Sequence, residues 1–176
     1  MNVPLMRNDT QINGLRNLCK WANFNGLKGQ AVEIGTYCGE GALVLSNYFD
    51  VVTAIDPWVN GYDKNDLASE QTSMDLVFKK FIENISNVKN IKYIPTLSEN
   101  ATKFFMDEFI DFLYIDGDHR HESVIKDISL WIKKIKKNGI ISGHDFSFNS
   151  VHNAIKKFFP NKKIELFDGD SWAILL

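Results

Sequence analysis

Short apolar runs alternate with amphipathic helical patterns along most of this chain, and this alternation limits its fold more than any other feature. Five runs have the length and composition of strands: residues 31–34, 51–55, 91–94, 110–115 and 139–142. Apolar residues at helical spacing predict helices at residues 10–25, 72–85, 98–106, 122–136 and 151–159, with a further helical pattern from Ala42. Such alternation is typical of a parallel sheet covered by helices on both faces.

The last part of the sequence departs from this alternation. Residues 164–167 and 171–176 are predicted strands around Asp168-Gly169-Asp170, a turn sequence typical of hairpins. This hairpin must add at least one antiparallel strand to the sheet. Before the first strand, Asp9 or Thr10 is expected to cap the first helix.

Length and composition predict one domain over residues 1–176, in which residues 1–30 form an N-terminal helix and lead-in. A chain of 176 residues with 44% hydrophobic residues can bury a sizeable core. The net charge of -2 gives no electrostatic reason to expect nucleic acid or an anionic membrane as a partner. No apolar run has the length of a membrane span, the polar N-terminus is unlike a signal peptide, and two cysteines cannot make a disulfide framework. We therefore expect a cytoplasmic protein.

Polar residues directly follow four of the apolar runs. They are Gly35, Asp56, Asp116 and the pair His144-Asp145. Ligands of open α/β sheets bind beyond the carboxyl ends of the strands. We therefore expect these residues to gather around one site.

The first strand and its turn indicate what that site binds. Gly35, Gly39 and Gly41 follow the strand, and glycine lets bare backbone approach a ligand. Their spacing differs from the Gly-x-Gly-x-x-Gly pattern of dinucleotide-binding proteins. Glu33, inside the strand, suits a ligand that carries an amine or hydroxyls better than it suits phosphate. Asp56 directly follows the second strand, a position at which nicotinamide enzymes also carry an acid.

At this point the chain resembles a known family. The segments VEIGTYCGEGALVLS, TAIDPW, FLYIDGDHRHESVIKDISLW and GIISGHDF resemble motifs of class I S-adenosylmethionine-dependent methyltransferases, in particular small O-methyltransferases of the macrolide-sugar and catechol-type metal-dependent groups. The resemblance covers roughly residues 31–158. It implies a Rossmann-like, doubly wound α/β fold with seven strands in the order 3-2-1-4-5-7-6 and the seventh antiparallel.

The resemblance also implies which residues bind S-adenosylmethionine. Glu33 would meet the amino group of its methionine part, and the turn that holds Gly35, Thr36, Tyr37 and Gly39 would pass close to it. Asp56 would accept hydrogen bonds from the ribose. Trp58 would stack on adenine or else belong to the core. Ser98 would bond near adenine, cap its own helix, or do both.

Asp116 and Asp145 end neighbouring strands of the implied sheet, so their carboxylates can converge on one divalent cation such as Mg²⁺. By resemblance, Asp116 is the first metal position, and His144 and Asp145 fill the second and third. Relatives often have two acids or Asp-Asn at the last two positions, and a histidine ligand shifts the preference toward Mn²⁺, Fe²⁺ or Zn²⁺. An acid pair that shares a proton is the alternative reading.

His119 follows Asp116 by three residues, and a histidine at this spacing in the macrolide-sugar relatives resembles a general base. We therefore assign Asp116 and His119 as the candidate catalytic residues. The alternative is that His119 caps the next helix. Asp118 would orient His119, add a metal ligand, or serve only as an acid at the start of that helix.

The function that these features favour is metal-assisted O-methylation of a small hydroxylated molecule, such as a sugar or a secondary metabolite. The polar segment 59–71 is expected to close over this acceptor. One alternative is a metal-independent methyltransferase that acts on nitrogen or on a protein, and another is a cofactor-binding module without turnover. A nicotinamide-dependent oxidoreductase fits the glycine spacing worst. Assembly into a homo-oligomer is left open.

Overall fold

A seven-stranded sheet forms the centre of the computed structural model, which describes residues 3, 5–61 and 73–176. The strands are β1 (Gln30–Ile34), β2 (Val51–Ile55), β3 (Ile91–Ile94), β4 (Ile110–Ile115), β5 (Ile135–Gly143), β6 (Glu165–Phe167) and β7 (Ser171–Leu175). Their order is β3-β2-β1-β4-β5-β7-β6, and β7 runs antiparallel to both neighbours, β5 and β6. The order and the direction that the family resemblance implied are therefore confirmed.

The parallel pairing brings the carboxyl ends of the central strands to one edge. Ile34, the last residue of β1, is in register with Ile55 of β2 and with Ile115 of β4. Ile115 in turn is in register with Gly143 of β5. The residues that follow these strands therefore emerge side by side.

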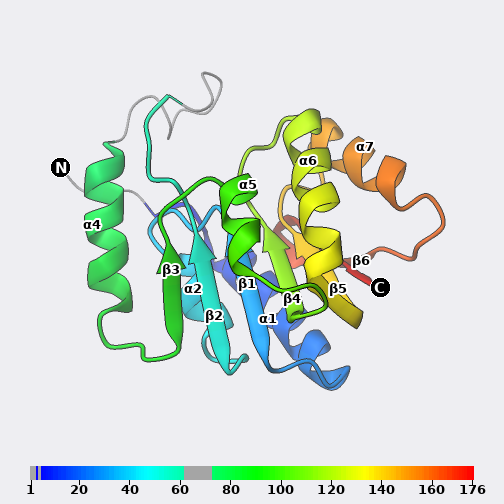
Figure 1. Cartoon of the computed structure of the whole chain (residues 1–176), viewed down its shortest axis with the longest axis horizontal. Coiled ribbons are helices and arrows are strands. Elements are labelled where there is room, and N and C mark those ends of the chain that lie inside the picture. Colours follow the sequence, from blue (N-terminus) through cyan, green and yellow to red (C-terminus); the bar gives the residue numbers. More distant parts are fainter. Residues whose placement is uncertain (1–2, 4, 62–72) are drawn as a thin grey trace.

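Helices cover both faces of the sheet (Figure 1). On one face, α1 (Asp9–Phe24), α2 (Glu40–Leu45) and α4 (Met74–Ile85) pack onto a core that includes Leu18, Leu45 and Phe81. On the other, α5 (Ser98–Ala101), α6 (His121–Trp131) and α7 (Asn149–Phe158) pack onto a second core cluster around Trp131. Sheets covered on both faces have strands that are apolar on both sides, as the fully buried β4 shows.

Several element boundaries differ from the expected ones. The predicted helix 122–136 ends at Trp131, a 3-10 turn (Ile132–Lys134) follows, and β5 begins at Ile135 instead of residue 139. Ile135 lies at helical spacing from the buried face of α6, which explains the prediction, but it pairs with Ile110 of β4. The predicted helix 98–106 is the short α5 followed by the 3-10 turn Thr102–Phe104.

The N-caps of α1 and α5 differ from the candidates that the sequence offered. Asn8, not Asp9 or Thr10, caps α1: its side chain accepts from the backbone N–H of Gln11, and the Gln11 side chain accepts from the backbone N–H of Asn8. These two bonds form a complete capping box, which satisfies two backbone donors at once. At α5 the N-cap is Leu97, and the Ser98 hydroxyl bonds elsewhere.

The hairpin predicted around the DGD segment is confirmed, since β6 and β7 pair antiparallel on either side of it. Asp168–Asp170 is a 3-10 turn in which Gly169 has φ 67°. The turn packs closely on α1: a Cβ added to Gly14 of that helix would lie 1.6 Å from the carbonyl oxygen of Asp168. The hairpin is therefore held against the N-terminal helix.

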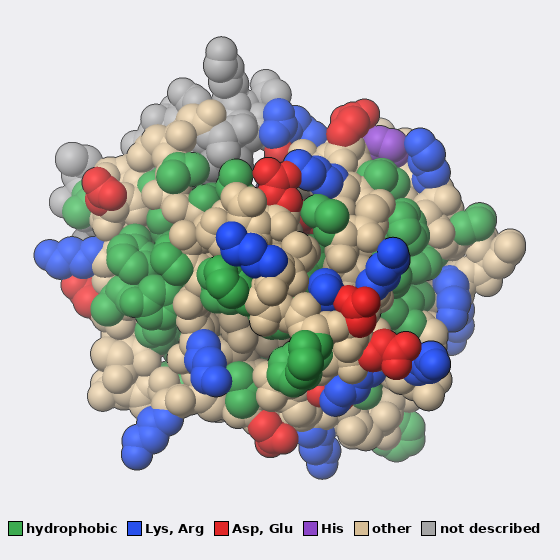
Figure 2. Space-filling view, in the orientation of Figure 1, with side chains coloured by type: hydrophobic (Ala, Val, Ile, Leu, Met, Phe, Trp, Pro, Cys, Tyr) green, Lys and Arg blue, Asp and Glu red, His purple; other side chains and the backbone are tan. Residues whose placement is uncertain are grey.

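Charges of both signs share one face of the molecule. Lys and Arg side chains are interspersed with Asp and Glu on the face that Figure 2 shows. No helix within the described part of the chain is long and apolar enough to cross a membrane. Of the segment 59–71 expected to close over the acceptor, residues 62–71 lie outside the described residues, so that expectation stays a prediction.

Candidate functional site

A cavity of about 500 Å³ opens at the carboxyl ends of the central strands. The residues that line it include most of those singled out from the sequence: Gly35, Thr36, Tyr37, Asp56, Ser98, Asp116, His119, His144 and Asp145. Its volume lies within the range of pockets that enclose small molecules. Glu33, Gly39 and Trp58 are outside this lining.

Asp56 is fixed in place by backbone amides. The N–H of Tyr37 donates to its Oδ2 at 2.9 Å, and the N–H of Trp58 donates to its Oδ1 at 2.8 Å. Burial raises the pKa of Asp56 to about 6, although both amides act to lower it. Each oxygen keeps a lone pair for a further donor, so the carboxylate can accept two hydroxyls from a ligand in the cavity.

Glu33 has the partners that the sequence alone could not supply. It is 1% exposed, and the Thr36 hydroxyl donates to its Oε2 at 2.6 Å. The Arg7 guanidinium lies 3.9 Å from its Oε1. Burial raises the pKa of Glu33 to about 7, against the lowering effect of Arg7 and Thr36. Glu33 therefore stands behind the cavity wall and orients the groups that form it.

The three glycines of the first turn do different things. Gly35 has φ 81°, and a Cβ there would lie 2.2 Å from the carbonyl oxygen of Asp116, so this glycine lets the turns after β1 and β4 meet. Gly39 faces α4, where a Cβ would lie 2.9 Å from the Phe81 ring. Gly41 lines the cavity, and a Cβ there would lie 1.8 Å from Glu33 Oε1.

Trp58 lies in the core. It is 7% exposed and its ring packs among Phe78, Phe81 and Tyr93. Its indole N–H donates to the carbonyl oxygen of Tyr37 at 2.9 Å. The geometry thus favours the core alternative for its ring, and its backbone contributes to the site through Asp56.

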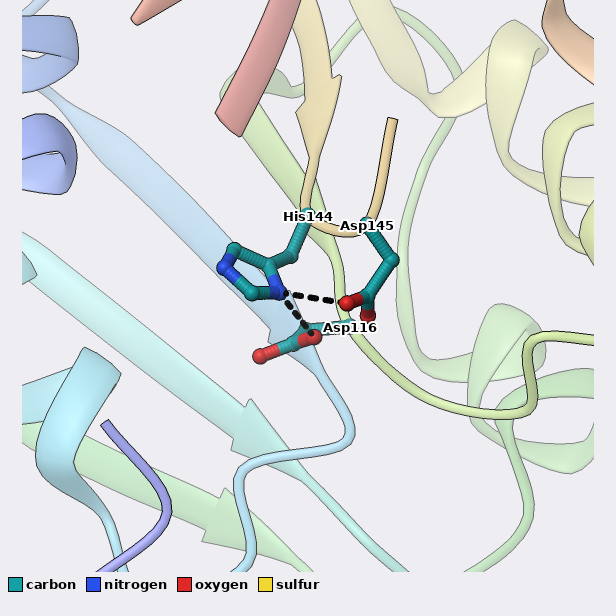
Figure 3. A group of neighbouring side chains, drawn as sticks. All are labelled: Asp116, His144 and Asp145. Atoms are coloured by element: carbon teal, nitrogen blue, oxygen red, sulfur yellow. Dashed lines mark ion pairs between the residues drawn. The ribbon is translucent and has the colours of Figure 1, made fainter. Parts of the chain in front are cut away.

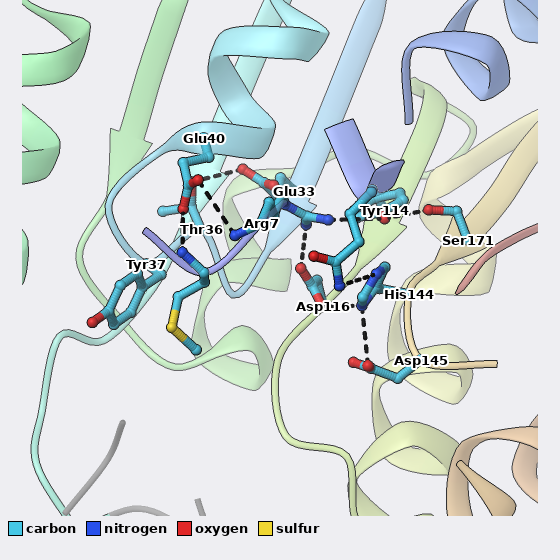
Figure 4. A network of polar contacts seen from close by, with 12 residues as sticks. Arg7, Glu33, Thr36, Tyr37, Glu40, Tyr114, Asp116, His144, Asp145 and Ser171 are labelled. Carbon is cyan, nitrogen blue, oxygen red and sulfur yellow. Dashed lines mark hydrogen bonds and ion pairs between the residues drawn. The ribbon is translucent and has the colours of Figure 1, made fainter. Parts of the chain in front are cut away.

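Arg7 is a site residue that the sequence reasoning missed. Its side chain is only 6% exposed, and its Nη2 donates to Asp116 Oδ2 (Figure 4). The guanidinium lies over the Tyr114 ring, 5.4 Å from its centroid. The backbone N–H groups of Met6 and Arg7 donate to the Glu40 carboxylate at 2.8 and 3.4 Å. The segment before α1 is therefore bound to the cavity wall through Glu40, and the Arg7 side chain contributes to the cavity lining.

Asp116, His144 and Asp145 form a group that can hold a metal ion (Figure 3). One ligand atom from each lies within 4.8 Å of the others. His144 Nδ1 is 3.1 Å from Asp145 Oδ1 and 3.7 Å from Asp116 Oδ1. Asp145 adopts φ 57°, a left-handed conformation that a non-glycine residue seldom takes and that recurs at functional sites. This backbone turn places the Asp145 carboxylate beside the ring of His144.

The ring of His144 is oriented from behind. Its Nε2 lies 2.7 Å from the carbonyl oxygen of Gly169, which can only accept, so Nε2 carries the hydrogen. The Gln11 amide nitrogen flanks the same atom at 3.3 Å. This arrangement turns Nδ1 toward the two carboxylates, and a backbone acceptor behind a histidine is the usual support of a metal ligand.

The members of the group shift one another's pKa values. Burial lowers the pKa of His144, but the hydrogen bond with Asp145 and the charge of Asp116 outweigh it and hold that pKa above its ordinary value. Burial raises the pKa of Asp116, and Arg7 and His144 offset part of that rise. For Asp145, burial is outweighed by the hydrogen bonds with His119 and His144, which hold its pKa well below its usual range.

His119 lies at the cavity mouth, half-exposed, with Nε2 2.8 Å from Asp145 Oδ2. Its ring makes an edge contact with Phe148. Asp118 bonds instead to the Arg120 side chain and backbone and to the Ser123 hydroxyl. Of the three roles considered for Asp118, these bonds favour the acid at the start of α6.

Comparison with known proteins finds a family, a curated relative and several solved structures that this chain resembles. A family described as a methyltransferase domain matches residues 32–146. An uncharacterized protein of Acanthamoeba polyphaga mimivirus is 30% identical over 118 residues, which are 65% of this chain and 50% of that protein. The chain thus spans about half the length of the curated relative that it matches.

Solved structures share the fold at low sequence identity. The O-methyltransferase NovP has a TM-score of 0.75 at 14% identity, covering 99% of this chain and 82% of that one. A calicheamicin methyltransferase has a TM-score of 0.70 at 12% identity, with coverage of 99% and 82%. A Staphylococcus aureus protein assigned as a caffeoyl-CoA O-methyltransferase has a TM-score of 0.66 at 16% identity, with coverage of 99% and 86%.

Proposed function

The chain belongs to a family of methyltransferase domains, and we propose that it transfers the methyl group of S-adenosylmethionine to an oxygen of a small hydroxylated molecule such as a sugar or a secondary metabolite. One observation carries this proposal. A single cavity joins Asp56, which suits a ribose, to the group Asp116, His144 and Asp145, which suits a divalent cation.

The cofactor half of the cavity fits S-adenosylmethionine in its donor set. Asp56 would accept the ribose hydroxyls, since two backbone amides already hold both of its oxygens in place. The turn at Gly35, Thr36 and Tyr37 would line the methionine part. Glu33, 3.9 Å from Arg7 and bonded to Thr36, would act on that part through these neighbours.

The metal half fits a divalent cation that accepts nitrogen as well as oxygen ligands. Two carboxylates and one imidazole Nδ1 would hold it, and the imidazole favours Mn²⁺, Fe²⁺ or Zn²⁺ over Mg²⁺. When bound, S-adenosylmethionine supplies an electrophilic methyl group, and a divalent cation lowers the pKa of an acceptor hydroxyl.

His119 is the residue placed to take the proton that the acceptor hydroxyl must lose. It lines the cavity, and the Asp145 carboxylate 2.8 Å from its Nε2 would stabilise the imidazolium that forms. Most of the remaining acceleration would come from holding the acceptor in line with the methyl group, which the cavity walls can do without further chemistry.

A specific contact favours a second candidate, a metal-independent methyltransferase that acts on nitrogen or on a protein. Arg7 already pairs with Asp116 and supplies a positive charge there. A nitrogen acceptor needs no metal to ionise it. In this reading Asp116, His144 and Asp145 only support the cavity wall.

Methyl transfer separates the two candidates. We expect S-adenosylhomocysteine to form when the protein is given S-adenosylmethionine and a panel of sugars and catechols, and we expect EDTA to stop turnover and Mn²⁺ to restore it. Asp145→Asn should stay inactive with Mn²⁺, whereas Asp118→Asn, which changes a cavity acid outside the group, should keep its response to the metal.

Calorimetry with S-adenosylhomocysteine in EDTA checks the cofactor independently, and binding should persist there. Turnover that survives both EDTA and Asp145→Asn would replace the metal-assisted reading with the metal-independent one. Absence of S-adenosylhomocysteine binding would refute both candidates.

A further inference from the structure

A directed chain of hydrogen bonds ends at a buried acid that lines the cavity. The Trp131 indole N–H donates to Ser98 Oγ at 2.8 Å. An indole nitrogen can only donate, so Ser98 accepts from it and turns its own hydrogen to Asp127 Oδ1, 2.5 Å away. The Ser98 hydroxyl is therefore committed on both sides.

The second oxygen of this acid remains available. Asp127 is 8% exposed, yet it lines the cavity. Within the described part of the chain no donor pairs with its Oδ2, and this oxygen is not among the fully enclosed polar atoms. Asp127 therefore contributes to the cavity lining a carboxylate of which one oxygen is still open to a donor from a ligand.

Other charges near Asp127 already have partners. Lys126 and Glu99, which also line the cavity, pair with each other, and Asp118 bonds to Arg120 and Ser123. Burial raises the pKa of Asp127 to about 6, and the Ser98 hydroxyl acts against that rise, so above this pH the group is a carboxylate that can only accept. A ligand that shuts water away from this oxygen must supply a donor to it, because a buried unpaired carboxylate oxygen is costly.

The position of Asp127 in the cavity defines which donor that is. Asp56, at the end of β2, suits the ribose, Pro57 after it adds apolar lining, and Leu97 adds more beside Ser98, the hydrogen-bond partner of Asp127. A purine ring placed against these residues presents either an exocyclic amino group or a carbonyl at its six position. The amino group donates to a carboxylate oxygen, whereas a carbonyl would be repelled by it.

We propose that Asp127 accepts a hydrogen bond from the exocyclic amino group of adenine and thereby selects an adenine cofactor against a six-oxo purine. This inference rests on the proposed cofactor, and it assigns the base contact to Asp127 instead of Ser98. The Trp131–Ser98 pair holds one oxygen of the carboxylate and leaves the other for the base.

A two-by-two binding experiment tests the proposal. S-adenosylhomocysteine and its hypoxanthine analogue, S-inosylhomocysteine, are titrated into the full chain and into Asp127→Asn by calorimetry. The wild type should prefer the adenine compound by at least tenfold. Asn keeps an oxygen for Ser98 and presents an amide that donates to a carbonyl, so the variant should lose that preference or reverse it.

Matched variants guard against simple misfolding. Asp118→Asn removes a charge from the same cavity without touching the Trp131–Ser98–Asp127 chain, so its preference should equal that of the wild type. Asp127→Ala should remove the preference without reversing it. If Asp127→Asn binds both compounds more weakly but in the wild-type ratio, Asp127 is only structural and the proposal fails. If the wild type binds neither compound, the proposed cofactor itself is wrong, and this inference is wrong with it.

Discussion

Replacing Gly14 by alanine should destabilise the protein, although the same change stabilises most helices. Alanine inside a helix is favoured over glycine by about 1 kcal/mol. Here the new Cβ would lie 1.6 Å from the carbonyl oxygen of Asp168, far inside the roughly 3.5 Å at which non-bonded heavy atoms pack. The obstacle is backbone, so no side-chain rotation can relieve the overlap, and α1 or the 168–170 turn must move.

The magnitude follows from two opposing effects. Overpacking of a tight contact costs about 1–3 kcal/mol, and a backbone overlap this deep belongs at the upper end. After the gain of about 1 kcal/mol in helix propensity, the net loss is about 2 kcal/mol. For a chain of 176 residues this lowers the melting temperature by about 4–8 °C.

Urea denaturation followed by circular dichroism measures the free energy of unfolding directly. Asn17→Ala is the matched control, since Asn17 is exposed on the same helix and should tolerate alanine well. The movement should also withdraw the Gly169 carbonyl from His144. If Gly14→Ala is as stable as Asn17→Ala, the tight packing of α1 on the turn is not what the structure implies.

Asp56→Ala should weaken S-adenosylhomocysteine binding by about 1–3 kcal/mol in calorimetry, because the ribose hydroxyls lose their acceptor; unchanged affinity would exclude Asp56 from the cofactor site. Arg7→Gln should tighten Mn²⁺ binding, measured by the loss of free-ion paramagnetic signal, because the Arg7 charge pairs with Asp116 and repels a cation; weaker binding would mean that Arg7 chiefly orients that carboxylate. The pKa of Glu33 is about 7 in the folded protein and 4.5 in the unfolded chain, so the folded state binds this proton more tightly. The free energy of unfolding should therefore fall by about 3 kcal/mol as the pH rises from about 4.5 through 7. Unfolding curves of Glu33→Gln across this range should lack that part of the pH dependence, and an identical profile would contradict the burial argument.

The fold was predictable because its elements have clear periodicity and because acids and glycines mark the strand ends. Asp56, Asp116, His144 and Asp145 all line the cavity for that reason. These contacts follow from strand register alone, so they need no knowledge of how side chains pack. The ends of helices and strands were predicted wrongly where a residue such as Ile135 fits both the helical and the strand periodicity.

The missed residues depend on tertiary contacts. Arg7 lies in a lead-in without periodicity, and its partner Asp116 is 109 positions away in the sequence. Gly169 acts through a backbone carbonyl, which residue identity does not reveal. Asp127 could have been found from the sequence, because it lies at helical spacing between the apolar residues Val124 and Trp131. An acid on the buried face of a helix indicates a specific partner.

The place of β7 in the sheet has a consequence for how the protein is made. β7 follows every other strand in the sequence but is inserted between β5 and β6. With it come the Gly169 carbonyl behind His144 and the Trp172 indole, which donates to the backbone oxygen of His144 at 3.1 Å. Long-range pairings of this kind close slowly. While the chain emerges from the ribosome, His144 is therefore synthesised before these two groups that hold it, and the site matures only after β7 has paired with β5.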